Sequence, residues 1–170
     1  MFHDVDLILE DDRCLYRCLI SPQHYSVAID KFHYHLPYRK IFGGITQFRK
    51  NDFVRINGYS NEYWGWGGED DDMYRRVTLA GRYRIRRPSS QFARYKMMTH
   101  SREKTNARNS KRRQLVNRWR YTDFLKNKRW QEDGINNINY TVIARKVEHV
   151  FLNITVDCLY DYRARLFLLL

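Results

Sequence analysis

The chain has 170 residues, of which 43% are hydrophobic and 15% aromatic. This length and composition are typical of one globular domain or of part of one, and they exclude a low-complexity chain. No apolar run approaches the roughly 20 residues that a membrane-spanning helix needs. The three cysteines are an odd number, so they predict no closed disulfide framework.

The chain is strongly basic, because 31 Lys and Arg against 19 Asp and Glu give a formal net charge of +12. Much of the excess lies between Arg102 and Arg120, in a polar, Asn-rich stretch. Such a run is typical of a nucleic-acid or membrane-surface patch, of a solvated face, or of a loop that closes over an anionic ligand such as a sugar nucleotide. Composition alone leaves these alternatives open.

The hydrophobic pattern predicts a series of short elements. In chain order they are strands at 4–9 and 24–32, a helix at 50–56, a helix at 71–80 that stops at Gly81, strands at 83–88 and 91–98, a helix from about residue 110 to beyond 121, and strands at 134–142 and 147–156. At an extended strand end, Asp4 and Asp6 would point to the same side and could share a divalent cation. A surface strand end is the competing interpretation, since such pairs are common by chance.

Residues 63–72 read YWGWGGEDDD and place two indoles and three glycines directly before four carboxylates. Adjacent acids repel one another, so they indicate an acidic first turn of a helix, a cation site or a catalytic site. The helix does not account for the tryptophans and glycines, which favour a mobile loop beside a site. Two adjacent glycines, Gly43 and Gly44, also predict a close backbone approach or a bulge.

Five motifs in one order carry a resemblance to a known family. They are Asp4-Val5-Asp6, Cys18, Phe42-Gly43-Gly44, the sequence WGWGGEDDD at 64–72, and Met97-Met98-Thr99-His100-Ser101-Arg102. This set closely resembles the catalytic domain of the β-1,4-galactosyltransferase family. The resemblance extends from Phe2 to about Val156. The resemblance implies an α/β fold of glycosyltransferase A type, in which helices flank a twisted, mostly parallel mixed sheet whose first βα units lie upstream. It assigns 1–156 to the catalytic domain and leaves 157–170 as a divergent tail.

The resemblance also implies a site and its chemistry. The metal ligands for Mn²⁺ would be Asp6, Met97 and His100, although an isolated Met and His at a strand end are more often core and surface residues. The catalytic residues would be Asp70, the base that deprotonates the acceptor hydroxyl in an inverting displacement, and Glu69. Donor-binding residues would be Asp4, Asp6, Ile41, Gly44, Trp66 and Glu69. Acceptor-binding residues would be Phe32, Tyr38, Gly44, Trp66, Asp70, Asp71, Arg112, Arg113 and Val116.

Ile41 bears on the choice of donor. Family members that transfer galactose carry a tyrosine at this position, whereas members with a shorter aliphatic residue accept N-acetylgalactosamine. The resemblance therefore favours UDP-GalNAc as donor and terminal N-acetylglucosamine as acceptor, with UDP-Gal as the alternative. A lectin-like relative without activity and a basic nucleic-acid-binding domain are the competing classes, and the acids of residues 69–72 argue against the second because they would repel a polyanion.

The remaining expectations concern the chain's surroundings. The family implies a type II protein of the Golgi membrane with a lumenal catalytic domain, whose anchor and uracil-binding region would lie upstream of Met1. We therefore expect these 170 residues to be inactive alone. Cys18 would pair with an upstream cysteine in the family, which leaves a strained pairing with Cys14 as the local alternative. Asn139 and Asn153 stand in glycosylation sequons, which matter if the chain is lumenal.

Overall fold

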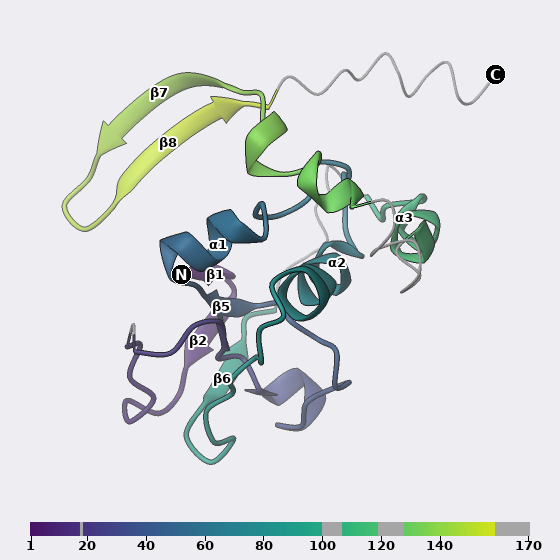
Figure 1. Ribbon diagram of the computed structural model, residues 1–170. Coiled ribbons are helices and arrows are strands. Elements are labelled where there is room, and N and C mark those ends of the chain that lie inside the picture. Colours follow the sequence, from purple (N-terminus) through teal and green to yellow (C-terminus); the bar gives the residue numbers. More distant parts are fainter. Residues whose placement is uncertain (18, 100–106, 119–127, 159–170) are drawn as a thin grey trace. The chain divides into compact units, whose positions relative to one another are not determined.

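The computed structural model describes residues 1–17, 19–99, 107–118 and 128–158. The chain divides into two compact units, Met1–Asn136 and Asn137–Leu170. The first unit contains short strands and helices joined by long connections (Figure 1). Its strands and α-helices are β1 Phe2–His3, β2 Leu7–Leu9, β3 Gln23–His24, β4 Ala28–Ile29, β5 Ile45–Gln47, α1 Lys50–Arg55, α2 Glu69–Arg75, β6 Arg94–Met97 and α3 Arg112–Arg118.

The strands of the first unit form two small sheets. One has the order β1-β5-β3 and is antiparallel. The other has the order β2-β6-β4, in which β2 pairs with β6 in the antiparallel sense and β4 pairs with β6 in the parallel sense. The α/β class is confirmed, but in the described part of the chain antiparallel pairings outnumber the single parallel one between named strands, contrary to the expected mostly parallel sheet.

The predicted helices are found in the described residues, with ends that differ by one or two residues. α1 matches its prediction, and α2 begins at Glu69 and continues as a π-helical turn over Arg76–Ala80 before Gly81. The helix predicted from residue 110 is α3, and the part of that prediction beyond residue 118 lies outside the described residues.

Three strand predictions were wrong in extent. Asp4 and Asp6 lie in a turn between β1 and β2, where the Leu7 N–H donates to the Asp4 carbonyl oxygen at 3.2 Å. Residues 83–88, predicted as a strand, form none, apart from a single bridge between Gln23 and Arg86. Strand 24–32 divides into β3, β4 and a 3₁₀ helix over Asp30–Phe32.

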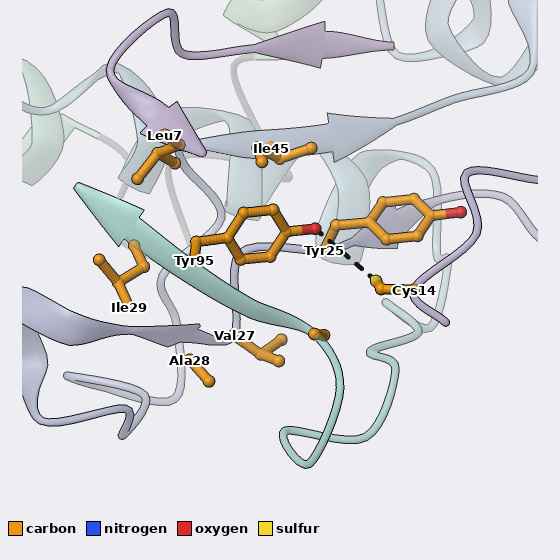
Figure 2. Packing of buried hydrophobic residues seen from close by; sticks show 9 residues of the cluster. Leu7, Cys14, Tyr25, Val27, Ala28, Ile29, Ile45 and Tyr95 are labelled. Carbon is orange, nitrogen blue, oxygen red and sulfur yellow. Dashed lines mark hydrogen bonds between the residues drawn. The ribbon is translucent and has the colours of Figure 1, made fainter. Parts of the chain in front are cut away.

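Two hydrophobic clusters hold the first unit together. The larger cluster surrounds Tyr95, whose hydroxyl lies 3.8 Å from the Cys14 sulfur, and Figure 2 shows this ring among the buried side chains of both sheets. Its members are Leu7, Cys14, Tyr25, Val27, Ala28, Ile29, Ile45, Ala93 and Tyr95. The smaller cluster packs α2 against the segment that precedes β5 and against the end of α1, through Phe42, Ile56, Met73 and Val77. The two clusters therefore fix the elements that carry the sequence motifs.

The second unit is a two-stranded antiparallel hairpin of β7 Thr141–Val147 and β8 Leu152–Asp157, with an irregularity between Val142 and Ala144. All of its strand residues are exposed. The strand predicted at 134–142 was wrong in its first half, where Ile135–Asn137 is a 3₁₀ helix. The divergent tail from residue 157 stays a prediction. Among the described residues, none of the helices has the length and apolar character needed to span a membrane.

Candidate functional site

The tryptophan-rich loop before α2 is held by a short backbone ladder to residues 107–109. The Trp66 N–H donates to the Ala107 carbonyl oxygen and the Asn109 N–H donates to the Trp66 carbonyl oxygen, each at 3.0 Å. Gly65 has a φ of +82°, and a Cβ at this position would lie 2.4 Å from the Ala107 carbonyl oxygen. Only glycine fits this contact, which accounts for the Trp-Gly-Trp pattern of the loop. The Trp66 side chain itself is half exposed.

The start of α2 arranges the four acids. Gly68 is the N-terminal flanking residue, with a φ of +102°, and the Asp72 N–H donates to its carbonyl oxygen at 3.0 Å. The Glu69 carboxylate turns back and accepts the Gly67 N–H at 3.0 Å. Carboxylates in the first turn interact favourably with the helix dipole, so the acids stabilise this helix end as they are brought together.

Asp70 lies directly against the Gly43 backbone. A Cβ at Gly43 would be 2.0 Å from the Asp70 Oδ2, so the glycine leaves the space that this carboxylate occupies. Burial raises the pKa of Asp70 to about 7, and the charges of Glu69, Asp4 and Asp71 contribute in the same direction. The carboxyl group therefore gains and loses its proton near neutrality, which suits a general base.

Asp4 approaches the same glycine segment, because its N–H donates to the Gly44 carbonyl oxygen at 3.2 Å. The pKa of Asp4 is raised by partial removal from water, by the charge of Asp6 and, to a smaller extent, by that of Glu69. Burial also raises the pKa of Tyr59 to about 12, with smaller contributions from Asp70 and Asp4. Acids from two distant parts of the chain, Asp4 and residues 69–71, thus act on one another electrostatically.

Two of the three predicted metal ligands are brought together. Asp6 directly precedes Leu7, which pairs with Met97 in the β2–β6 ladder, and the Asp6 carbonyl oxygen accepts the Met98 N–H at 2.7 Å. His100 lies outside the described residues. The described part of the chain holds no cluster of three His, Cys, Asp or Glu suited to a metal, but the predicted set includes a thioether and His100, so it stays a prediction. The charge of Asp6 beside Asp4 is an environment that a cation would stabilise.

Other predicted contact residues line the surroundings of α2. The Tyr38 hydroxyl donates to the Asp71 Oδ1 at 3.4 Å, and burial followed by the charge of Asp71 raises the pKa of Tyr38 to about 12. Arg112 lies beside Gly67 and Gly68, and the Val116 carbonyl oxygen accepts a hydrogen bond from Arg75, which joins α3 to α2.

Three further predicted residues are placed less tightly. Ile41 is half-buried directly before the glycine segment, and Arg113 is exposed on α3. Phe32 packs against the larger hydrophobic cluster. These positions neither confirm nor contradict their expected ligand contacts.

Sequence reasoning missed the polar network behind α2. Arg76 is fully buried and donates to the Asp72 Oδ2 at 2.7 Å and to the Asp133 Oδ2 at 3.0 Å. Asp133 also accepts the Asn61 N–H at 2.7 Å, so residues near 133 are joined both to α2 and to the connection that leads into the tryptophan loop. Burial raises the pKa of Asp72 to about 6, against the lowering effect of Arg76. No pattern in the sequence distinguishes this buried arginine from the many exposed ones.

The chain is similar in sequence to known galactosyltransferases. A family model described as the N-terminal domain of galactosyltransferase matches residues 23–101. Human β-1,4-galactosyltransferase 2 is 44% identical over 157 residues, which is 92% of this chain and 40% of that protein. The chain belongs to the β-1,4-galactosyltransferase family. It spans about 40% of the length of this curated relative.

Solved structures support the family assignment. The catalytic domain of Drosophila β-1,4-galactosyltransferase 7 in complex with xylobiose has a TM-score of 0.66 and 27% identity, and the match covers 92% of this chain and 66% of that one. A mutant of the same enzyme in complex with manganese, UDP-Gal and xylobiose matches with the same TM-score and coverage and 26% identity. The glycosyltransferase A-type fold is therefore confirmed for this member of the galactosyltransferase family.

Proposed function

We propose that this chain forms the acceptor-activating part of a glycosyltransferase site, which moves a hexose from a UDP-sugar to a hydroxyl group of a glycan. The observation that carries the proposal is the Asp70 carboxyl group, packed against Gly43 among other acids, whose pKa of about 7 suits a base at neutral pH. Family membership supports the reaction class.

The residues around Asp70 suit a single displacement. Asp70 would remove the proton from the acceptor hydroxyl while that oxygen attacks the anomeric carbon from the face opposite the leaving diphosphate, which inverts the configuration. Asp71 is held by Tyr38, and the Glu69 carboxylate by the Gly67 N–H, so both are oriented beside the base as candidate partners of sugar hydroxyl groups. A buried carboxyl group with a raised pKa holds the accepted proton well.

The donor set fits a manganese ion. Asp6 and Met97 would bind it together with His100, and Mn²⁺ accepts carboxylate oxygen readily, imidazole nitrogen as well, and thioether sulfur weakly. When bound, the ion stabilises the negative charge that develops on the leaving nucleoside diphosphate. Asp4, beside Asp6, would face the donor sugar, and a cation near these acids would favour their charged forms.

Relatives named as galactosyltransferases, and the manganese and UDP-Gal complex of the Drosophila enzyme, support UDP-Gal as the donor. A specific residue favours UDP-GalNAc as a second candidate: Ile41 leaves more room beside the glycine segment than the family's tyrosine would. We expect terminal N-acetylglucosamine as acceptor. The chain's location in the Golgi lumen and glycosylation of the exposed Asn139 and Asn153 are part of the same proposal.

The test uses the protein at its full natural length, because this chain covers only part of its curated relative. UDP release and sugar transfer to an N-acetylglucosamine-terminated acceptor are measured with UDP-Gal and UDP-GalNAc, with manganese or with EDTA. We expect manganese-dependent transfer that Asp70→Asn abolishes, and we expect Ile41→Tyr to lower the rate with UDP-GalNAc relative to UDP-Gal. Transfer that persists in Asp70→Asn would refute the role of the base.

A further inference from the structure

We propose that the half-buried Arg87 and the buried His24 form a clamp that positions residues 41–44, and that this clamp sets both the wall of the donor pocket at Ile41 and the backbone against which Asp70 packs. The inference rests on the proposed function of the site. Neither residue is expected to touch a substrate, so both are positioning residues.

The Arg87 guanidinium is the outer part of the clamp. Its Nη2 donates to the Ile41 carbonyl oxygen at 2.8 Å and to the Arg39 carbonyl oxygen at 3.1 Å, and its Nε donates to His24 Nδ1 at 3.1 Å. One planar group therefore ties the chain at Ile41 to the end of β3. A lysine cannot reproduce this fork of directed donors.

His24 is the inner part. It is fully buried, and because its Nδ1 accepts the Arg87 hydrogen bond, its Nε2 carries the proton and donates to the Gly43 carbonyl oxygen at 2.9 Å. Burial and the neighbouring Arg87 lower the pKa of His24 to about 4, so the ring is neutral and keeps this tautomer at physiological pH.

Ser26 completes the attachment of the glycine segment. Its hydroxyl group donates to the Gly43 carbonyl oxygen at 2.8 Å and accepts the Ile45 N–H at 2.9 Å. Gly44 has a φ of +76°, and a Cβ there would lie 2.5 Å from the Ser26 Oγ. Residues 41–44 precede β5 and lie outside the sheet ladders, so side chains supply hydrogen bonds to the Ile41 and Gly43 carbonyl oxygens.

The clamp reaches the site through direct contact. The Gly43 carbonyl oxygen accepts hydrogen bonds from His24 and Ser26, and the Asp70 carboxylate lies where a Gly43 side chain would point, 2.0 Å from a Cβ there. The next residue, Gly44, accepts the Asp4 N–H. A shift of this segment would therefore displace the base relative to the donor side of the site. Misplacement of a reacting group by about 1 Å can lower a rate about 100-fold.

The test compares Arg87→Lys with Arg86→Lys in the full-length protein. Arg86 is the matched control, because its side chain is exposed and its links to Pro22 and His24 are made by the backbone. We expect Arg87→Lys to lower kcat about 10- to 100-fold with a much smaller change in KM, and to move the ratio of kcat/KM for UDP-Gal and UDP-GalNAc towards one. Arg86→Lys should leave all of these values unchanged.

A second pair of variants separates positioning from folding. Glutamine at position 24 can accept from Arg87 and donate to the Gly43 carbonyl oxygen, whereas leucine can do neither. We expect His24→Gln to retain most of the transfer and His24→Leu to lose it, with both melting temperatures recorded. Equal activities of these two variants, or an Arg87→Lys variant that keeps the parent's kcat and donor ratio, would overturn the proposal.

One measurement does not depend on transfer. The ¹⁵N NMR signals of the His24 ring should show the Nε2–H tautomer with a slowly exchanging proton, and Arg87→Lys should abolish that pattern while Arg86→Lys retains it. An Nδ1–H tautomer in the parent would overturn the clamp. A parent that shows the expected tautomer and transfers neither sugar would instead refute the proposed function.

Discussion

Replacing Asp70 with asparagine should make the protein more stable and inactive at the same time. The folded carboxyl group has a pKa of about 7, raised first by burial, against the ordinary value of 3.8. The folded state holds this proton more tightly than the unfolded state. The contribution of this group to the free energy of unfolding is therefore fully present below pH 3.8 and is lost as the pH rises through 7. The difference between the two pKa values corresponds to about 4 kcal/mol. Asparagine has nearly the same shape and carries no charge, so it removes the free-energy cost of ionising a buried carboxyl group above pH 7.

The assay is urea unfolding of the parent, of Asp70→Asn and of Asp12→Asn, an exposed control, in EDTA at several pH values. The gain from Asp70→Asn should be small near pH 4 and reach about 4 kcal/mol at pH 8, while Asp12→Asn should follow the parent. EDTA is required because a cation beside the acids would lower their pKa values. A gain that does not change with pH, or no gain at pH 8, would refute the electrostatic account of the site.

Other changes test the packing around Asp70 and the dependence on a metal ion. Gly43→Ala places a Cβ 2.0 Å from the Asp70 Oδ2, so we expect a loss of about 100-fold in kcat measured by UDP release, and parent-like kinetics would contradict the contact. Arg76→Leu leaves Asp72 and Asp133 buried without their cation and should lower the free energy of unfolding by about 3–5 kcal/mol; an unchanged urea midpoint would contradict the network. Chelation of divalent ions should abolish transfer, and added Mn²⁺ should restore it.

Local signals in the sequence were sufficient for the helices and for the loop before α2. The acids and glycines of residues 65–72 fix a helix start with their own chemistry, so the predicted start differed from the observed one by only two residues. Strand predictions failed where the pattern reflects burial alone. Tyr83 and Ile85 pack against the smaller cluster while Arg82, Arg84 and Arg86 are exposed, so the alternation is present without a strand ladder. Pairing depends on distant partners, which periodicity cannot reveal.

The same limit applies to the site. The short motifs single out Asp4, Gly43, Gly44 and Asp70 as site residues, and the structure places Asp4 and Asp70 beside the two glycines, while their roles stay a prediction. The buried and half-buried residues that hydrogen-bond around these segments, Arg76, Arg87 and His24, were not recognised. In the sequence a buried arginine resembles an exposed one, and only the three-dimensional structure shows the carbonyl and carboxylate oxygens that surround it. A chain with 31 basic residues makes this distinction especially difficult.

The structure explains how four consecutive acids coexist at one helix start. Successive residues of a helix point about 100° apart, so adjacent carboxylates are directed to different partners. Glu69 accepts the Gly67 N–H, Asp71 accepts the Tyr38 hydroxyl, and Asp72 pairs inside the protein with Arg76 one turn later. Asp70 is instead packed against a glycine among like charges, and its pKa is raised more than that of Asp72. The surrounding acids thus have structural partners, whereas Asp70 has a pKa of about 7, which is the property that the proposed base requires.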